Sequence, residues 1–189
     1  VDQFKFKAKA GQEVTFAVLS ARIEDKIHDL QAHVDPILTL TDSTGRELAS
    51  GDDYYRADPL LNYRFEKDGE YTLQVRDVSY AGNPHWVYRL TVTSGPFVTS
   101  TLPSAVSSSA SGSVRAWGFN LGGADVAPVE LHGITETGAP LVRLKTAAGP
   151  SNPIPVLLTD LPISATPMDT KWDAPQPLVL PVAACGLLA

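Results

Sequence analysis

The stretch from residue 34 to residue 77 constrains the fold most strongly, because it alternates apolar and polar residues between closely spaced turn signals. One turn signal lies at Asp42-Ser-Thr-Gly45 and a second at Lys67-Asp-Gly-Glu70. Aspartate and glycine tolerate the backbone angles of tight turns, and a period of two places alternate side chains on opposite faces of a sheet. The stretch is therefore typical of an extracellular β-sandwich and not of an enzyme core.

The same alternation continues on both sides of this stretch. Apolar residues occupy every second position in four segments: Phe4 to Ala8, Val14 to Val18, Tyr71 to Val75 and Trp86 to Val92. Each segment is predicted to be a half-buried antiparallel strand, with Trp86 and Tyr88 pointing inward like Leu90 and Val92. Residues 20 to 33 differ, because Ile23, Ile27 and Leu30 recur at helical spacing behind Ser20, which predicts a short helix or helical loop.

The character of the chain changes near residue 95. Residues 99–113 are rich in Ser, Thr and Ala, which favours a connection or an edge over a core. Short strands are predicted at 114–119, 126–131, 141–144 and 155–159, and again at 178–182 after a Pro-rich linker. The predicted organisation is a β domain at residues 1–94, a smaller β domain at residues 95–161, and a linker and strand at residues 162–189.

Composition and charge exclude several classes of protein. The chain has 189 residues, of which 43% are apolar, and its net charge is −6. An acidic balance gives no electrostatic footprint for nucleic acid, and no apolar run approaches the about 20 residues of a membrane helix. We therefore predict neither nucleic-acid binding nor membrane insertion. The single cysteine, Cys185, cannot form an internal disulfide, and the opening residues carry no signal peptide, so we expect a piece of a longer protein.

Three motifs carry a resemblance to a known family: residues 4–12 (FKFKAKAGQ), residues 35–42 with 45–50 (DPILTLTD, GRELAS), and residues 68–77 (DGEYTLQVRD). They resemble the bacterial pre-peptidase C-terminal domain. Residues 52–61 (DDYYRADPLL) and 82–86 (GNPHW) make it similar to modules in exported proteins of planctomycete-type bacteria. The resemblance covers residues 1–93. It implies a jelly-roll-like β-sandwich in a secreted, cell-surface or periplasmic protein, and it carries no catalytic motif.

Residues 96–156 resemble, more weakly, an immunoglobulin-like domain of the plexin and transcription-factor type. Such a domain commonly follows the first module, so the resemblance implies an all-β chain in which a smaller immunoglobulin-like sandwich follows the jelly-roll-like one.

The resemblance of residues 1–93 to the pre-peptidase C-terminal domain also implies a strand ahead of Phe4 that this sequence lacks. The tail at residues 176–189 is similar to such an opening strand. We hypothesise that it fills the unpaired edge, in its own chain or by swapping into a neighbour; the alternative is a frayed terminus.

The sequence contains no catalytic constellation. It has no G-x-S-x-G elbow, Walker loop or G-x-G-x-x-G motif. His28 and His33 have four residues between them, which is not the spacing that places two metal ligands on one helical face, and His85 and His132 are isolated. The chain is predicted to be no enzyme itself, although its parent protein could be a secreted peptidase.

A calcium site is the first candidate for a ligand. Calcium takes six to eight hard oxygens, and Asp42, Asp52, Asp53 and Asp58 lie on loops that could supply some of them. The alternative, which we favour, is that Asp42 caps a turn while Asp52 and Asp53 bond local backbone or pair with Arg56. No other cofactor is predicted.

Tyr54, Tyr55 and Arg56 form the second candidate, because exposed aromatic side chains can stack on sugars or anchor a peptide. The alternative is that one tyrosine packs inward beneath residues 20–33.

From these features we expect a non-catalytic structural or interaction module that spaces or docks the neighbouring domains of its parent protein. The alternative function is calcium-assisted binding of a polysaccharide or an extracellular matrix protein, as part of a secreted hydrolase.

Overall fold

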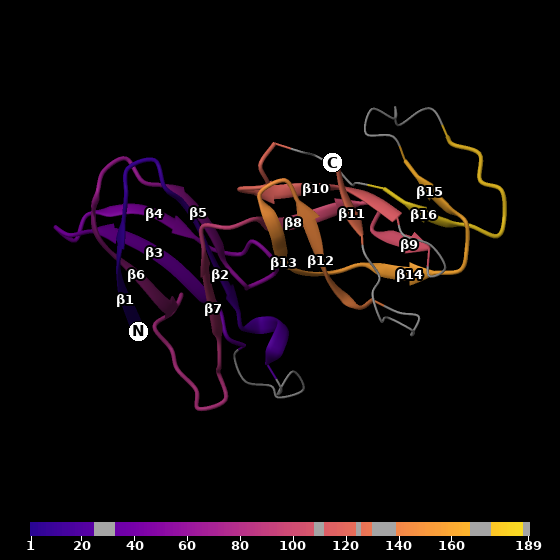
Figure 1. Ribbon diagram of the computed structural model, residues 1–189. Helices are drawn as coiled ribbons and strands as arrows, with labels where there is room; N and C mark the ends of the chain where they lie inside the picture. The colour runs from indigo at the N-terminus through magenta and orange to yellow at the C-terminus, as the bar shows by residue number, and fades with distance from the viewer. Residues whose placement is uncertain (25–32, 108–111, 124–125, 130–138, 167–174, 187–189) are drawn as a thin grey trace. The chain divides into compact units, whose positions relative to one another are not determined.

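The computed structural model describes residues 1–24, 33–107, 112–123, 126–129, 139–166 and 175–186 (Figure 1). These residues form two compact units, 1–94 and 95–189, each with its own core. Within the described ranges the regular structure is β-strand apart from one short 3-10 turn, which confirms the all-β class. The sheets do not close into a barrel, and no helix among these residues is long and apolar enough to cross a membrane.

The first unit contains two antiparallel sheets. One sheet has the strand order β1 (Asp2–Ala8), β6 (Gly69–Asp77), β3 (Pro36–Asp42) and β4 (Glu47–Gly51). The other has the order β5 (Leu60–Arg64), β2 (Glu13–Leu19) and β7 (Arg89–Thr93). The predicted turn at Asp42 to Gly45 joins β3 to β4, and Gly45 adopts a φ of 84°, which favours glycine.

Both sheets direct side chains into one core, so they face each other as two layers. Phe16 of β2 and Leu38 of β3 are fully buried, and the ring of Phe6 lies 5.5 Å from that of Phe16. The rings of Phe65 and Tyr71 approach to 4.4 Å. The remaining buried apolar side chains of this core come from β1, β2, β3, β5 and β6: Ala8, Val14, Val18, Leu40, Leu61, Leu73 and Val75.

One prediction about inward-facing residues in this unit is wrong, and a second holds only in part. The strand predicted from Trp86 begins only at Arg89, so Trp86 lies in the segment that precedes β7. Tyr88 also precedes β7, but it packs against the core as predicted. Phe4 and Val92 follow the core-facing alternation, yet they remain 41% and 50% exposed. The physical reason is that β1 and β7 are the edge strands of their sheets, where an inward side chain has strand neighbours on one side only.

The helix predicted over residues 20–33 is only partly open to comparison, since residues 25–32 lie outside the described ranges. The described part holds a single 3-10 turn, η1 (Ala21–Ile23), and the backbone is extended again at Glu24. Ser20 does not cap this turn with its side chain. Its Oγ donates a hydrogen bond to the carbonyl oxygen of Val87 instead, at 2.7 Å.

The second unit is built from shorter pieces. A three-stranded antiparallel sheet contains β8 (Phe97–Leu102), β10 (Gly112–Phe119) and β11 (Val126–Val129), and an antiparallel pair contains β12 (Leu141–Thr146) and β13 (Gly149–Pro155). Two pairs are parallel: β9 (Ala105–Ser107) with β14 (Leu157–Thr159), and β15 (Ile163–Ala165) with β16 (Ala183–Cys185). Apolar side chains of β8 to β14 meet in a core that includes Val98, Val114, Val129, Leu144 and, between β13 and β14, Val156.

The Ser/Thr/Ala-rich stretch at residues 99–113 forms strands as well as a connection. It contains β9 and the last four residues of β8, and the side chains of Ala105 and Val106 are buried in the core. The prediction of an edge is confirmed, since β8 and β9 are edge strands of their sheets. The expectation that the stretch adds little to a core is wrong, because small and β-branched residues fill a core where strands approach closely. Gly118 shows how close the approach is: its φ is 154°, and a Cβ atom there would lie 2.0 Å from the carbonyl oxygen of Phe97.

The strand predicted at residues 178–182 is absent. The described tail pairs instead through β16, whose partner β15 lies within the predicted linker. Residues 175–181 are all exposed and lie outside any strand. Whether the tail also completes the edge of the first unit stays a prediction.

Replacing Phe16 with alanine should destabilise the chain by about 3–5 kcal/mol, because it leaves a cavity between the two sheets. The matched replacement Phe4→Ala removes the same side chain from an edge position and should cost only about 1–2 kcal/mol. Denaturant unfolding of both variants measures the difference. Equal losses would contradict the assignment of the core between the sheets.

Candidate functional site

The hairpin of β3 and β4 brings three carboxylates together at one end of its sheet. Asp35 directly precedes β3, and Asp52 and Asp53 directly follow β4, which pairs with β3 so that Leu38 lies opposite Gly51. One carboxylate oxygen from each aspartate lies within 4.8 Å of the others. We call these three residues the Asp35 cluster. A cluster of this size resembles part of a calcium shell, in which carboxylates are joined by carbonyl and water oxygens.

Asp35 is the least solvated member of the cluster. Its Oδ1 atom is buried and has no hydrogen-bond partner among the described residues, while Asp52 and Asp53 are exposed. The pKa of Asp35 is raised above its usual value, chiefly by desolvation and then by the negative charges of Asp53, Asp52 and Asp77. The ionised form of Asp35 is thus disfavoured in the folded chain, and a bound cation would offset that penalty.

Asp77 closes the same end of the sheet from β6. One of its carboxylate oxygens, Oδ2, accepts a hydrogen bond from the backbone nitrogen of Asp35 at 3.1 Å. The other accepts from the backbone nitrogens of Ser79 and Ala81, at 2.9 Å and 3.2 Å. Both oxygens are therefore used in shaping the turn after β6.

Asp42 does not join the cluster, because it lies at the opposite end of β3. Its Oδ1 accepts hydrogen bonds from the backbone nitrogens of Thr44 and Arg46, at 2.9 Å and 3.1 Å, and its Oδ2 lies 3.2 Å from the Arg46 Nε. The Thr44 hydroxyl also donates to it, and this bond is the main cause of a lowered pKa for Asp42. Asp42 caps the turn, as the alternative interpretation predicted.

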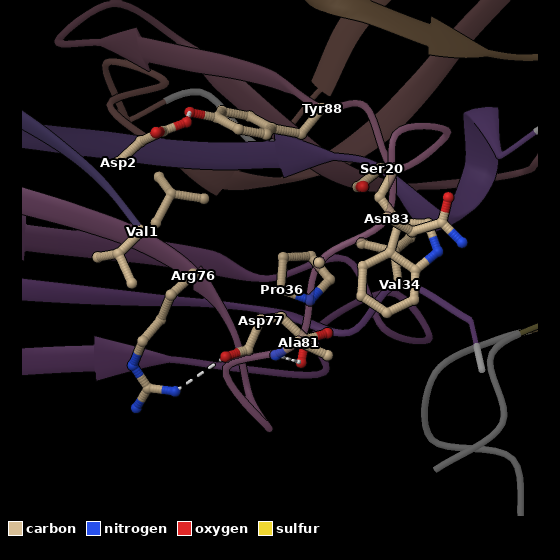
Figure 2. A pocket seen from close by; sticks show the side chains of 13 residues that line it. Val1, Asp2, Ser20, Val34, Pro36, Arg76, Asp77, Ala81, Asn83 and Tyr88 are labelled. Carbon is tan, nitrogen blue, oxygen red and sulfur yellow. Dashed lines mark hydrogen bonds between the residues drawn. The ribbon is translucent and has the colours of Figure 1, made fainter.

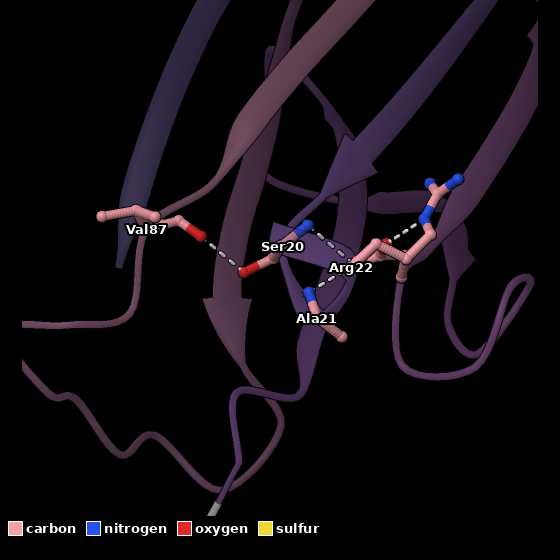
Figure 3. Close-up of polar contacts among 5 residues, drawn as sticks. Ser20, Ala21, Arg22 and Val87 are labelled. Atoms are coloured by element: carbon pink, nitrogen blue, oxygen red, sulfur yellow. Dashed lines mark hydrogen bonds and ion pairs between the residues drawn. The ribbon is translucent and has the colours of Figure 1, made fainter. Parts of the chain in front are cut away.

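Asp58 is the buried anchor of a different loop. Its carboxylate accepts hydrogen bonds from the backbone nitrogens of Ser20 and Ala21, both at 2.7 Å, and forms an ion pair with the Arg22 guanidinium (Figure 3). The side chain is only 1% exposed. Asp58 therefore fixes η1 and is not available to a metal ion. Of the four aspartates in the predicted calcium set, the structure brings together only Asp52 and Asp53.

Tyr54 and Tyr55 are both 54% exposed, in line with the ligand interpretation. Tyr55 is also held structurally. Its backbone forms a two-way bridge with Asp58, and the Arg22 guanidinium lies 4.6 Å from the centre of its ring. Arg56 is exposed and adopts a φ of 54°, at the tip of the same tight turn. The loop thus presents Tyr54 and Arg56 to solvent, while Tyr55 is braced against η1.

A hollow of about 170 Å³ lies beside this end of the first unit, and its lining includes Asp2, Ser20, Asp77, Trp86 and Tyr88 (Figure 2). The Tyr88 hydroxyl donates a short hydrogen bond to the Asp2 carboxylate. Burial and this carboxylate raise the pKa of Tyr88. The described lining residues include no histidine, cysteine or lysine.

The histidines show no arrangement for catalysis in the described part of the chain. His33 Nδ1 lies 3.1 Å from the Glu24 carboxylate, and His85 is exposed in the segment before β7. His28 and His132 lie outside the described residues.

Asp35 is the residue that sequence reasoning missed. A signal was present, because the turn centred near Thr44 places residues 35 and 53 at equal distances along the two arms of the hairpin. Counting outward from the turn would have paired them.

Comparison of the chain with known protein families, with curated proteins and with solved structures finds no match. The resemblance to the pre-peptidase C-terminal domain therefore rests on the sequence motifs alone.

The opposite pKa shifts of Asp35 and Asp42 predict opposite effects of the same substitution. Asp35→Asn should raise the melting temperature at pH 7, because the raised pKa means that ionised Asp35 opposes folding. Asp42→Asn should lower it, because the lowered pKa means that ionised Asp42 supports folding. The effect at Asp35 should fade as the pH falls through the raised pKa toward about 4, and the effect at Asp42 only below about pH 4, as the pH falls through the lowered pKa. Thermal unfolding between pH 3 and pH 7 checks the signs, and two shifts of the same sign would contradict the assignment.

Proposed function

We propose that the chain is a non-catalytic structural and interaction module of a larger secreted or cell-surface bacterial protein, in which it spaces or docks neighbouring domains. In this proposal the first unit is a jelly-roll-like sandwich and the second is a smaller immunoglobulin-like one. The bacterial and extracellular setting rests on the motifs in residues 1–93.

One observation carries the non-catalytic part of this proposal: the polar groups around the hollow are already bonded within the fold. Ser20 donates to Val87, Asp77 accepts from three backbone nitrogens, and Tyr88 donates to Asp2. A catalytic group needs a free lone pair or proton directed at a substrate.

An array of polysaccharides and extracellular matrix proteins, probed with the full chain, tests the interaction role. We expect saturable binding to a polymer or a protein, and no turnover of chromogenic ester, glycoside or peptide substrates. The variant Tyr54→Ala should weaken a contact made through the exposed loop, while Tyr63→Ala serves as an aromatic control within the first unit. Turnover that co-purifies with the chain would contradict the proposal.

Calcium binding at the Asp35 cluster is a second candidate function, because the buried Oδ1 of Asp35 lacks a partner within the described residues and faces a concentration of negative charge. The three carboxylates would supply part of the shell, and water would complete it at the exposed Asp52 and Asp53. A calcium ion here would fix the loop that carries Tyr54 and Arg56, which is how calcium would assist binding of a polysaccharide or matrix protein.

Calorimetric titration of the full chain should show calcium binding with a dissociation constant in the range of about 0.1–1 mM, as in other extracellular modules. The double variant Asp52→Asn/Asp53→Asn should abolish it, and asparagine suits the φ of 44° at residue 53. Asp42→Asn is the matched control, since Asp42 lies outside the cluster. Absence of heat, together with an unchanged melting temperature in calcium, would remove this candidate.

A further inference from the structure

The two layers of the first unit are closed along one side and open along the other. On the closed side, β4 approaches β5 so tightly that a Cβ atom on Gly51 would lie 2.7 Å from the carbonyl oxygen of Leu60. The other two edge strands are β1 and β7. At one end they are joined by a hydrogen bond, which the hydroxyl of Tyr88, directly before β7, donates to Asp2 of β1.

Core-facing side chains are left uncovered on the open side. Phe4 shares its face with the buried Ala8, and Val92 lies opposite the buried Phe16, so both point toward the core. They are nevertheless 41% and 50% exposed. Phe6 lies on the same face of β1 as Phe4, and its ring contacts that of Phe16 in β2, the strand next to β7. We call the area of Phe4, Phe6 and Val92 the β1–β7 opening.

The second unit carries a segment with matching properties. Residues 176–182 have the sequence QPLVLPV, without a charged residue, and their length equals that of β1. Leu178 and Leu180 are 53% and 80% exposed, and residues 176–181 belong to no strand and are wholly on the surface. Exposed apolar side chains on a segment of this length are typical of an interaction site.

We propose that residues 176–182 of a second copy of this chain add a strand to the free edge of β1 and cover the β1–β7 opening. This inference rests on the interaction role proposed above, and it names the partner. Main-chain hydrogen bonds to β1 would supply the affinity, and apolar contacts with Phe4 and Val92 the register.

The positions of the prolines determine which residues of the segment can bond to β1. In an antiparallel ladder, successive residues direct their N–H and C=O groups to alternate sides. Pro177 and Pro181 lack an N–H group and have the same parity, so they must face away from β1. Leu178, Leu180 and Val182 then bond to β1, and all three side chains lie on one sheet face. We place that face toward the core, where Phe4 and Val92 are exposed. The prolines would also end the sheet, because they leave the new edge without donors.

Charge disfavours the simplest competing contact, pairing of β1 with β1 of another copy. Such a pair would bring Lys5 and Lys7 of both chains onto one small area of sheet, and like charges across strands are unfavourable. The uncharged segment 176–182 avoids this repulsion. Reciprocal exchange between two copies would give a two-fold symmetric dimer.

Sedimentation of the full chain over a range of concentrations tests the inference. We expect a monomer–dimer equilibrium that the double variant Leu178→Asp/Leu180→Asp shifts to monomer. The matched control is Val179→Asp, which adds a charge to the same segment on the face directed away from the core, and it should leave the dimer intact. A wild-type chain that stays monomeric, or a control that dissociates equally, would overturn the inference.

Crosslinking identifies the occupant. In a Cys185→Ala background, chains carrying Val92→Cys are mixed with chains carrying Leu180→Cys and treated with a short bismaleimide. A covalent dimer is expected. Crosslinking confined to single chains that carry both cysteines would mean that a chain's own tail fills the opening, and would overturn the proposed second copy. If the chain dimerises but binds nothing on the array, this inference is supported and the proposed binding function is not. If the chain is monomeric but binds a polymer or protein on the array, this inference is overturned and the proposed function is supported.

Discussion

Burial of aromatic rings between two sheets is the constraint on which the first unit depends. Phe6, Phe16 and Tyr71 come from three strands and Phe65 directly follows a fourth, and the ring centres lie 4.4 Å to 6.1 Å from neighbours in the same group. Tilted and edge-on ring contacts stabilise a core beyond the area that they bury. These rings fill the space between the two layers and so hold the sheets that carry the acidic loops.

The sequence predicted the fold well wherever alternation coincided with turn chemistry. The strands at residues 4–8, 14–18 and 71–75 and the turn at Asp42 to Gly45 are all present, since period-two burial and the needs of a tight turn are local properties. Prediction failed where a neighbour decides the outcome. Val92 has the residue type and parity of a core position, yet no alternation pattern reveals that its strand lies at an edge.

The candidate site was predictable in part for the same reason. Asp52 and Asp53 were found from their residue type, but the four aspartates of the set serve different ends in the structure. Asp42 is tied to its own turn, Asp58 is buried under η1, and the cluster draws its third member, Asp35, from across the hairpin. The sequence shows where the carboxylates are along the chain, but strand pairing determines which of them lie close together in space.

The bonding of Asp58 and Ser20 has a consequence for motion. Asp58 enters β5 and binds the backbone at the end of β2, while the Ser20 hydroxyl binds the segment that enters β7. These are the three strands of one sheet, and one polar junction holds all of them at the same end. Opening any one of these loops breaks bonds shared with the others, so amide protons there should exchange as a single cooperative group, slower than in separately anchored loops.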